Sequence, residues 1–480
     1  QTVHAYPSGG VSYIVALENL GTLQGLVAAA ALLIDYVLTA AVSLTAGVAA
    51  IASAFPGLWP HRVTLALLGL LLITLLNMRG VRETGTVIAI PVYLFLATYL
   101  PMLAYGLVRA VVEGPGSFDP AAVPGQQLLT TLLILHTFSA GCTALTGIEA
   151  ISNGVPAFRP PESKNAGITL IVMAALMAVL FAGSIGLTHY FAVIPAGEET
   201  ILSALARRLL GSGPAYLTIQ VSTLLILVVA ANTSFAGFPR LASILARDGF
   251  LPRQLSALGD RLAFNNGILV LTAATAALIV VFQGDTHALI PLFAVGVFLA
   301  FTLSQIGMVV HWAQERKGSW AVKAGINGVG GLLTGMTLVI VGVSKFAEGA
   351  WISLLLIPLL VGIFLPIRAH YRELARQLSL QGSSPALQKF APIRAVVPIS
   401  GVHRGVVDAI NFARAITKNV TAAYIELEPG SGEKVQKEWA RSWPDVPLVI
   451  IPSPYRSIIG PLLDYLDLID TRYNDGQAAV

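Results

Sequence analysis

The stretch from Gly25 to Phe55 constrains the fold more than any other part of this chain. It contains thirty-one residues, almost all of them apolar, and a single charged side chain, Asp35. An α-helix needs roughly 20 apolar residues to cross the hydrocarbon core of a bilayer. The stretch is therefore predicted to be a long, tilted membrane-spanning helix that holds a carboxylate inside the membrane.

Three hydroxyl-bearing side chains accompany Asp35 on this helix. At about 100° of rotation per residue, Tyr36, Thr39 and Ser43 share an arc of roughly 100° with the carboxylate. An ionisable group at membrane depth is costly unless it faces a partner or a watery cavity. Oxygen ligands suit a hard cation or a proton, so this face is a candidate ion site. The alternatives are a structural carboxylate paired with a neighbouring helix, and hydroxyls bonded to carbonyls of their own helix.

The composition indicates that most of the chain is membrane-embedded. Only 11% of its 480 residues are charged, against about a quarter in soluble domains, and the mean hydropathy is +0.76. The single cysteine, Cys142, excludes a disulfide framework and multi-thiolate zinc clusters. The pI of about 9.1 is typical of basic cytoplasmic loops, and no nucleic-acid partner is expected. No Walker A, G-x-S-x-G or H-E-x-x-H motif is present, so we expect neither an enzyme nor a cofactor.

Ten spans are predicted in total, behind a partial one. After the long span they are 61–77, 86–112, 128–155, 165–191, 214–238, 267–282, 288–312, 324–343 and 351–366. The segment from Pro239 to Asn265 is read as a long basic connection. One set of alternate connections carries eleven basic residues and the other five, which predicts a plasma-membrane protein with a cytoplasmic C-terminal tail. The opening residues lack an initiator Met and a signal peptide, so the chain is expected to be truncated at its start.

The span at 128–155 is predicted to be a discontinuous helix. Its middle, Ser139 to Glu149, is rich in glycine, hydroxyls and small residues, and unwound backbone is tolerated at membrane depth only where it lines a cavity. Thr146 and Glu149 share a helical face at a spacing of three, and carboxylates at this depth serve as proton relays. The alternative for Glu149 is a capping or gating salt bridge with a cytoplasmic arginine.

Two further polar groups lie inside predicted spans. His136 is expected to be a satisfied interior histidine. The run from Asn232 to Ser234 is read as a polar contact between helices, and the alternative, part of a sodium site, is implied only by the family resemblance described below.

The pattern changes to strand-then-helix repeats from Ile393 onwards. Strands are predicted at 393–399, 420–426 and 446–451, and helices at 405–416, 433–443 and 458–469. This alternation predicts a small parallel α/β domain, and gives a transmembrane domain at 1–370, a linker at 371–389 and a cytosolic domain at 390–480. Three units bury little core, so a homodimer is expected. The turn from Gly401 to Arg404 is either a phosphate-binding loop or a plain strand-to-helix turn.

Several motifs give the chain a family resemblance. It resembles the amino acid–polyamine–organocation (APC) transporter superfamily, and within it the KimA-type potassium–proton symporters. The superfamily motifs are Pro7-Ser8-Gly9-Gly10-Val11-Ser12-Tyr13, Asn77-Met78-Arg79-Gly80-Val81-Arg82-Glu83, Gly147-Ile148-Glu149-Ala150 and Leu245-Ala246-Arg247-Asp248-Gly249-Phe250-Leu251-Pro252. The KimA-type segments are Leu33 to Thr39, Ala144 to Asn153, Pro291 to Phe298 and the C-terminal domain.

The resemblance implies a LeuT-like fold of twelve helices in two inverted repeats, with helices one and six broken. On that scheme the long span is helix three and 128–155 is helix six, while helix one is missing and helix two is partial. The C-terminal domain would be universal-stress-protein-like and would help to form a homodimer, with a cyclic dinucleotide as a regulator. Phe293 stands where the family is expected to place a tyrosine, which would remove or reshape one ligand.

Together these expectations define a secondary active transporter for proton-coupled potassium uptake. Potassium would be held by Asp35, Thr39, Ser43, Thr146 and Glu149, with Tyr36 and Phe293 lining the path and Glu149 and Asp35 coupling the proton. Two alternatives remain, an amino acid permease of the superfamily and a membrane-anchored nucleotide sensor. The span at 86–112 holds no lysine, which favours the cation over a lysine-switched amino acid.

Overall fold

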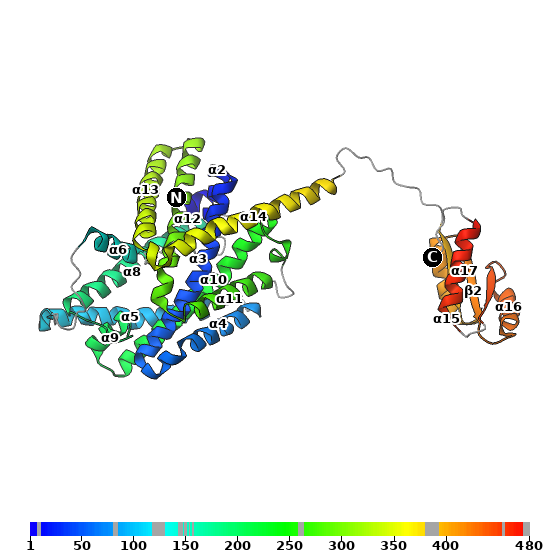
Figure 1. Cartoon of the computed structure of the whole chain (residues 1–480), viewed down its shortest axis with the longest axis horizontal. Helices are drawn as coiled ribbons and strands as arrows, with labels where there is room; N and C mark the ends of the chain where they lie inside the picture. The colour runs from blue at the N-terminus through cyan, green and yellow to red at the C-terminus, as the bar shows by residue number, and fades with distance from the viewer. Residues whose placement is uncertain are drawn as a thin grey trace. The chain divides into compact units, whose positions relative to one another are not determined.

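The computed structural model describes residues 1–6, 11–79, 85–117, 130–142, 147, 151–152, 154–155, 158–257, 264–379, 393–453 and 457–473. The chain divides into two compact units, Gln1–Gln377 and Leu378–Val480, and each is described by itself. The first is helical, and the second is an α/β unit (Figure 1).

Ten of the helices in the first unit correspond to the ten predicted spans. The unit contains α1 (Thr2–Ala5), α2 (Val11–Leu20), α3 (Thr22–Ala54), η1 (Pro56–His61), α4 (Arg62–Met78), α5 (Gly85–Glu113), α6 (Thr131–Cys142), α8 (Glu162–Tyr190), α9 (Ile201–Leu210), α10 (Pro214–Arg247), η4 (Arg253–Leu255), α11 (Asn265–Val281), α12 (Thr286–Glu315), α13 (Trp320–Ser344), η5 (Phe346–Ala350) and α14 (Trp351–Gln377). Within the described ranges, eight helices are long and apolar enough to cross a membrane, while α6 and α11 are shorter apolar helices. The protein is therefore a multi-pass membrane protein.

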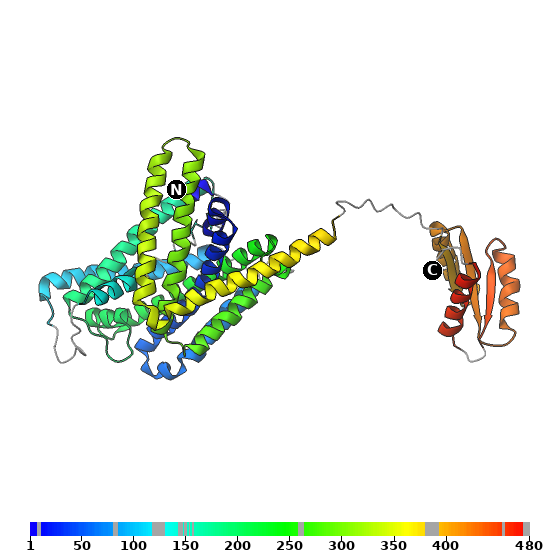
Figure 2. The same cartoon turned by 45° about the horizontal axis from the view of Figure 1, so that its top comes forward.

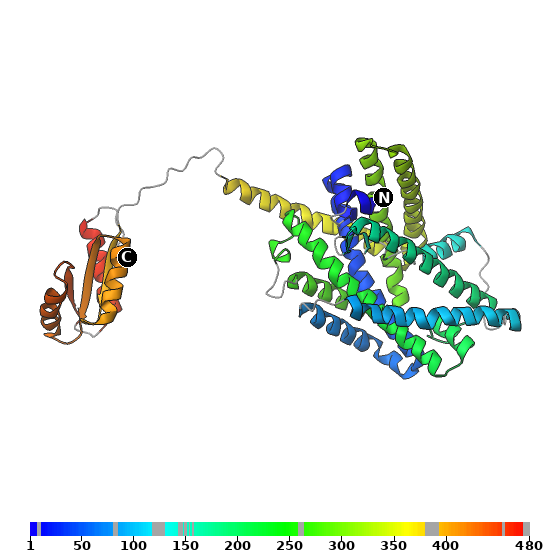
Figure 3. The ribbon, with the colours of Figure 1, turned by 180° about the vertical axis from the view of Figure 1, so that it is seen from behind.

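Helix α3 lies at the centre of this unit. Its most apolar stretch is 78% buried, whereas that of α8 is not buried at all. The alanines from Ala28 to Ala31 are fully buried, and small residues of this kind allow neighbouring helices to approach closely. Figure 2 shows the α12–α13 hairpin beside α2, and Figure 3 shows α5 and α8 converging toward one end.

Two helices continue beyond the positions where the sequence predicts them to end. The expectation that a connection begins at Pro239 is wrong, because α10 continues through that residue to Arg247. A proline removes a single backbone donor, and this one packs against Gly267 of α11, where an added Cβ would lie 2.9 Å from the Pro239 Cβ. Helix α14 likewise continues to Gln377, so the first seven residues of the predicted linker, 371–377, are helical.

The second unit is built on a three-stranded parallel sheet with the order β1-β2-β3, as the alternating pattern predicts. Its elements are β1 (Arg394–Ile399), α15 (Arg404–Ile416), β2 (Asn419–Glu426), α16 (Ser431–Ser442), β3 (Leu448–Pro452) and α17 (Ile459–Tyr473). Ile410 of α15 and Trp439 of α16 pack with Ala422 on one face of the sheet. Ile469 of α17 packs with Ala423 on the other face, so each face has its own core.

Candidate functional site

Asp35 lies near the middle of α3, which is the most buried of the described candidate membrane helices. It is thirteen residues from the start of α3 and nineteen from its end, and its side chain is fully buried. A carboxylate at this depth is energetically expensive, which makes it the first candidate for a functional group. The sequence expectation of a buried intramembrane acid therefore agrees with its position in the structure.

Helix α10 runs antiparallel to α3 along this face. Gly47 of α3 lies against Leu224 of α10, where an added Cβ would be 3.1 Å from the leucine Cδ1. Further along, Gly237 lies against the Tyr36 ring, and an added Cβ there would be 2.9 Å from the phenol oxygen. The two contacts fix the register of the helices and hold the Tyr36 ring, 5% exposed, next to the buried acid.

The same register brings two hydroxyls to one depth. Thr39 is one turn beyond Tyr36 on α3, and Ser234 is one turn before Gly237 on α10, so the two side chains lie level with each other. Both hydroxyl oxygens are buried, and neither has a hydrogen-bond partner among the residues that the structure describes. Buried hydroxyls are almost always paired, so two such oxygens beside a carboxylate fit a cation that supplies the missing contact.

Helix α12 packs against the opposite side of α3 at the depth of Asp35. The residues at this depth are called the Asp35 layer. Gly296 approaches α3 so closely that an added Cβ would be 3.1 Å from the Ala31 carbonyl oxygen. Near the start of α12, the hydroxyls of Thr45 of α3 and Thr286 of α12 are 3.0 Å apart, which fixes the two helices to each other at that end. This register places Phe293, which is 6% exposed, at the depth of the buried carboxylate. The position contributes an apolar wall and no oxygen ligand.

The remaining predicted ligands divide into described and undescribed residues. Ser43 is buried, at 8% exposure, on the same helix as the acid. Thr146 and Glu149 lie outside the described residues, so their expected roles stay predictions. The described part of α6 reaches Cys142, and Gly147, the next described residue, has a φ of +97°, so the backbone is not α-helical at this position inside the span that is predicted to be discontinuous.

Other polar residues that the sequence singled out are engaged elsewhere. The Asn77 amide donates to Asn232 at 2.6 Å, which is a polar contact between α4 and α10. The Thr233 hydroxyl donates at 2.6 Å to a carbonyl of its own helix. His136 lies 3.0 Å from the Lys345 ammonium, so it is a satisfied histidine, as expected.

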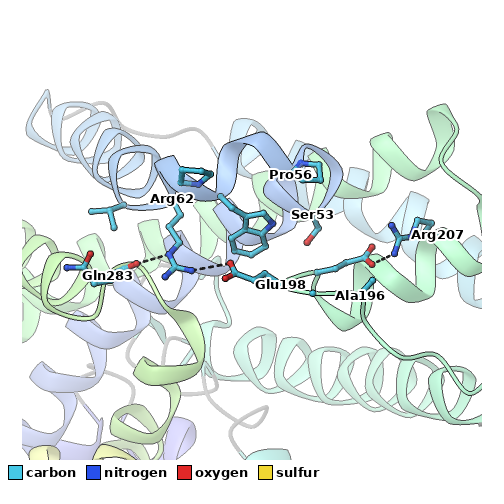
Figure 4. A pocket seen from close by; sticks show the side chains of 12 residues that line it. Ser53, Pro56, Arg62, Ala196, Glu198, Arg207 and Gln283 are labelled. Carbon is cyan, nitrogen blue, oxygen red and sulfur yellow. Dashed lines mark hydrogen bonds and ion pairs between the residues drawn. The ribbon is translucent and has the colours of Figure 1, made fainter. Parts of the chain in front are cut away.

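A second polar site lies beyond the carboxyl end of α3 (Figure 4). This pocket has a volume of about 670 Å³. Arg62 donates to the Gln283 carbonyl at 2.9 Å and to Glu198 at 3.3 Å, and Arg207 pairs with Glu199. Each of these carboxylates faces an arginine, so the pocket is bridged by ion pairs and is a poorer cation site than the layer around Asp35.

Comparison with known proteins agrees with this division into a membrane unit and an α/β unit. Residues 3–374 match the amino acid permease family, and residues 392–480 match the KimA potassium transporter C-terminal domain. The chain is 40% identical over 483 residues to the potassium transporter KimA of Bacillus subtilis (strain 168), covering all of this chain and 79% of the relative. It is 25% identical over 198 residues to the mitochondrial cationic amino acid transporter 3 of Arabidopsis thaliana, covering 41% of this chain and 31% of that protein.

Proposed function

This chain belongs to the amino acid permease family and carries a KimA-type C-terminal domain, and we propose that it transports potassium across the cell membrane. One observation carries the proposal: a fully buried carboxylate, Asp35, lies near the middle of helix α3, at the level of buried hydroxyls that have no described partner. The relative that matches the whole chain is itself named a potassium transporter. An oxygen-only set of ligands suits a hard cation and not the zwitterion of an amino acid.

The ion is held chiefly by residues of α3. Asp35 supplies the neutralising charge, and Thr39 and Ser43 supply neutral oxygens from the same face. Ser234 of α10 adds a hydroxyl at the level of Thr39. Tyr36 borders the ion site on the side of α10. Phe293 forms an apolar wall on the opposite side and gives the ion no ligand.

Proton coupling follows from having two carboxylates in one path. A buried carboxylate is strongly favoured in a neutral state, either protonated or paired with a cation. With Asp35 occupied by potassium, Glu149 is the group that carries the proton, and Thr146, three residues earlier in the sequence, supplies a further hydroxyl oxygen. Uptake then requires both acids to be neutralised before the site changes its exposure to the two sides of the membrane.

The orientation follows from the basic connections, whose excess on one side supports a cytoplasmic position for the end of α14 and the C-terminal domain.

Two copies of the C-terminal domain associate through apolar side chains that α17 leaves exposed, among them Ile459 and Leu463. A pocket of about 500 Å³ beside Ser400, Tyr424 and Ser431 is the place for a cyclic dinucleotide regulator, because ligands of parallel α/β sheets bind at the carboxyl ends of the strands.

The test is rubidium flux into proteoliposomes that contain the full-length protein. Asp35→Asn keeps the size of the side chain and removes its charge, so rubidium uptake should fall at least a hundredfold while the protein remains folded. Asp408→Asn, at an exposed position on α15, is the matched control and should transport normally. Wild-type uptake by Asp35→Asn, or uptake of labelled amino acids in place of rubidium, would refute the proposal.

A further inference from the structure

Two arginines of α10 share a pocket at the end of that helix where Arg247 lies. Arg240 and Arg247 both line a cavity of about 530 Å³ between α2, α4, α10 and α11. They are seven residues apart, so they project from the same face of α10 about 10 Å from each other along its axis. Two positive charges therefore line one pocket.

Neither guanidinium has an ion pair or a hydrogen bond among the residues that the structure describes. Arg240 is half-buried seven residues before the carboxyl end of α10, whereas Arg247 is exposed at that end. An arginine side chain stays protonated in proteins, so it cannot escape this environment by releasing its proton. A permanent charge at such a position needs a counter-anion.

Three charged groups near this end of α10 have partners among the residues that the structure describes. Asp248, the next residue along the chain, accepts a hydrogen bond of 2.6 Å from the Tyr13 hydroxyl. The Arg253 guanidinium lies 4.8 Å from the centre of the Tyr371 ring, and that of Arg368 lies 4.3 Å from the Phe250 ring. Arg240 and Arg247 differ from Asp248, Arg253 and Arg368 in having no partner among the described residues.

The other walls of the pocket define the ligand. Asn77 and Ser243 add polar groups, while Phe235, Pro239 and Ile268 form an apolar surface next to the guanidiniums. Planar guanidinium groups match the oxygens of a phosphate, and basic pockets between membrane helices bind anionic lipid headgroups.

We propose that Arg240 and Arg247 bind an anionic phosphate group in this pocket. The apolar wall beside the two charges favours a phospholipid, whose phosphate contacts the arginines and whose acyl chain covers Phe235 and Ile268. Free inorganic phosphate shares the same anionic chemistry and would leave that wall uncovered. The site is separate from the Asp35 layer and does not depend on which ion the protein carries.

Binding is measured by native mass spectrometry of the purified full-length protein, titrated with phosphatidylglycerol or with phosphatidylcholine of the same acyl chains. Phosphatidylglycerol should bind more tightly. Arg240→Gln and Arg247→Gln should each weaken its binding about fivefold, and the double variant more than tenfold. Arg372→Gln, at an exposed position on α14, is the control and should leave binding unchanged.

A parallel titration with inorganic phosphate identifies the source of the anion. If phosphate binds with the same dependence on the two arginines and the lipid does not, the anion site stands and its ligand is free phosphate. If neither ligand responds to the double variant, the proposal is overturned. Should the glutamine variants fail to fold, the Arg240→Lys/Arg247→Lys protein keeps both charges and must retain at least part of the binding. Because the readout is binding and not flux, failure here would leave the transport proposal intact.

Discussion

The contact between Gly237 and Tyr36 allows a sharp test of the proposed ion site. Gly237→Ala adds one methyl group to α10, and the position of that group overlaps the Tyr36 ring and lies 2.9 Å from its hydroxyl oxygen. The ring is 5% exposed and the core around it is packed, so it has little room to move aside. The substitution therefore pushes the side chain that borders the buried carboxylate.

The expected change in the free energy of unfolding is the difference between two opposing effects of the added methyl group. Replacing glycine by alanine inside a helix stabilises it by up to about 1 kcal/mol. Forcing a methyl group into a filled core destabilises by about 1–3 kcal/mol. The net loss of unfolding free energy is therefore on the order of 1 kcal/mol. Displacement of Tyr36 should also weaken the apparent affinity for rubidium by about tenfold.

The measurements are thermal unfolding in detergent and the concentration dependence of rubidium uptake. The matched control is Gly342→Ala, because Gly342 of α13 has open space around the position of an added Cβ. This control should be as stable as the parent or more so, with unchanged uptake. A double-mutant cycle with Tyr36→Ala should be clearly non-additive in stability, since the two residues touch. If Gly237→Ala is as stable as Gly342→Ala and transports normally, the close packing of this layer is not what positions the site.

Three further outcomes are expected. Thr39→Val removes a buried hydroxyl that has no described partner, so thermal stability should be unchanged or higher while the apparent rubidium affinity falls severalfold; unchanged affinity would remove Thr39 from the site. Leu463→Asp on α17 should shift the full-length protein toward the monomer in sedimentation, and an unaltered dimer would locate the interface elsewhere. Arg62→Gln should lower the midpoint of thermal unfolding by less than about 3 °C, because exposed ion pairs contribute little; a larger shift would mean that this bridge is a main support of the fold.

Hydrophobic length and the cost of a buried charge were enough to predict the central helix. Gly25 to Phe55 coincides closely with α3, and the expectation that Asp35 faces the interior follows from the free-energy penalty of exposing a carboxylate to lipid. The parallel sheet was predictable for a similar reason, because alternation of strands and helices leaves few other arrangements.

Positions that depend on the register between helices were not predictable. Nothing local in the sequence indicates that Gly237 faces Tyr36 or that Ser234 lies level with Thr39, because both relations depend on how α10 slides along α3. The extension of α10 through Pro239 was missed because a local rule ends helices at proline, whereas packing against α11 stabilises the continuation.

The depth of Asp35 gives the protein an electrical property. The carboxylate lies near the middle of α3, so a cation that reaches it from either side crosses roughly half of the transmembrane field. Moving one elementary charge through the whole field corresponds to about 2.3 kcal/mol per 100 mV, and half of it to about 1.2 kcal/mol. Ion occupancy at Asp35 should therefore change by nearly a factor of ten for each 100 mV. The membrane potential would thus draw a cation from the outer solution into this layer and oppose its loss back to the outside.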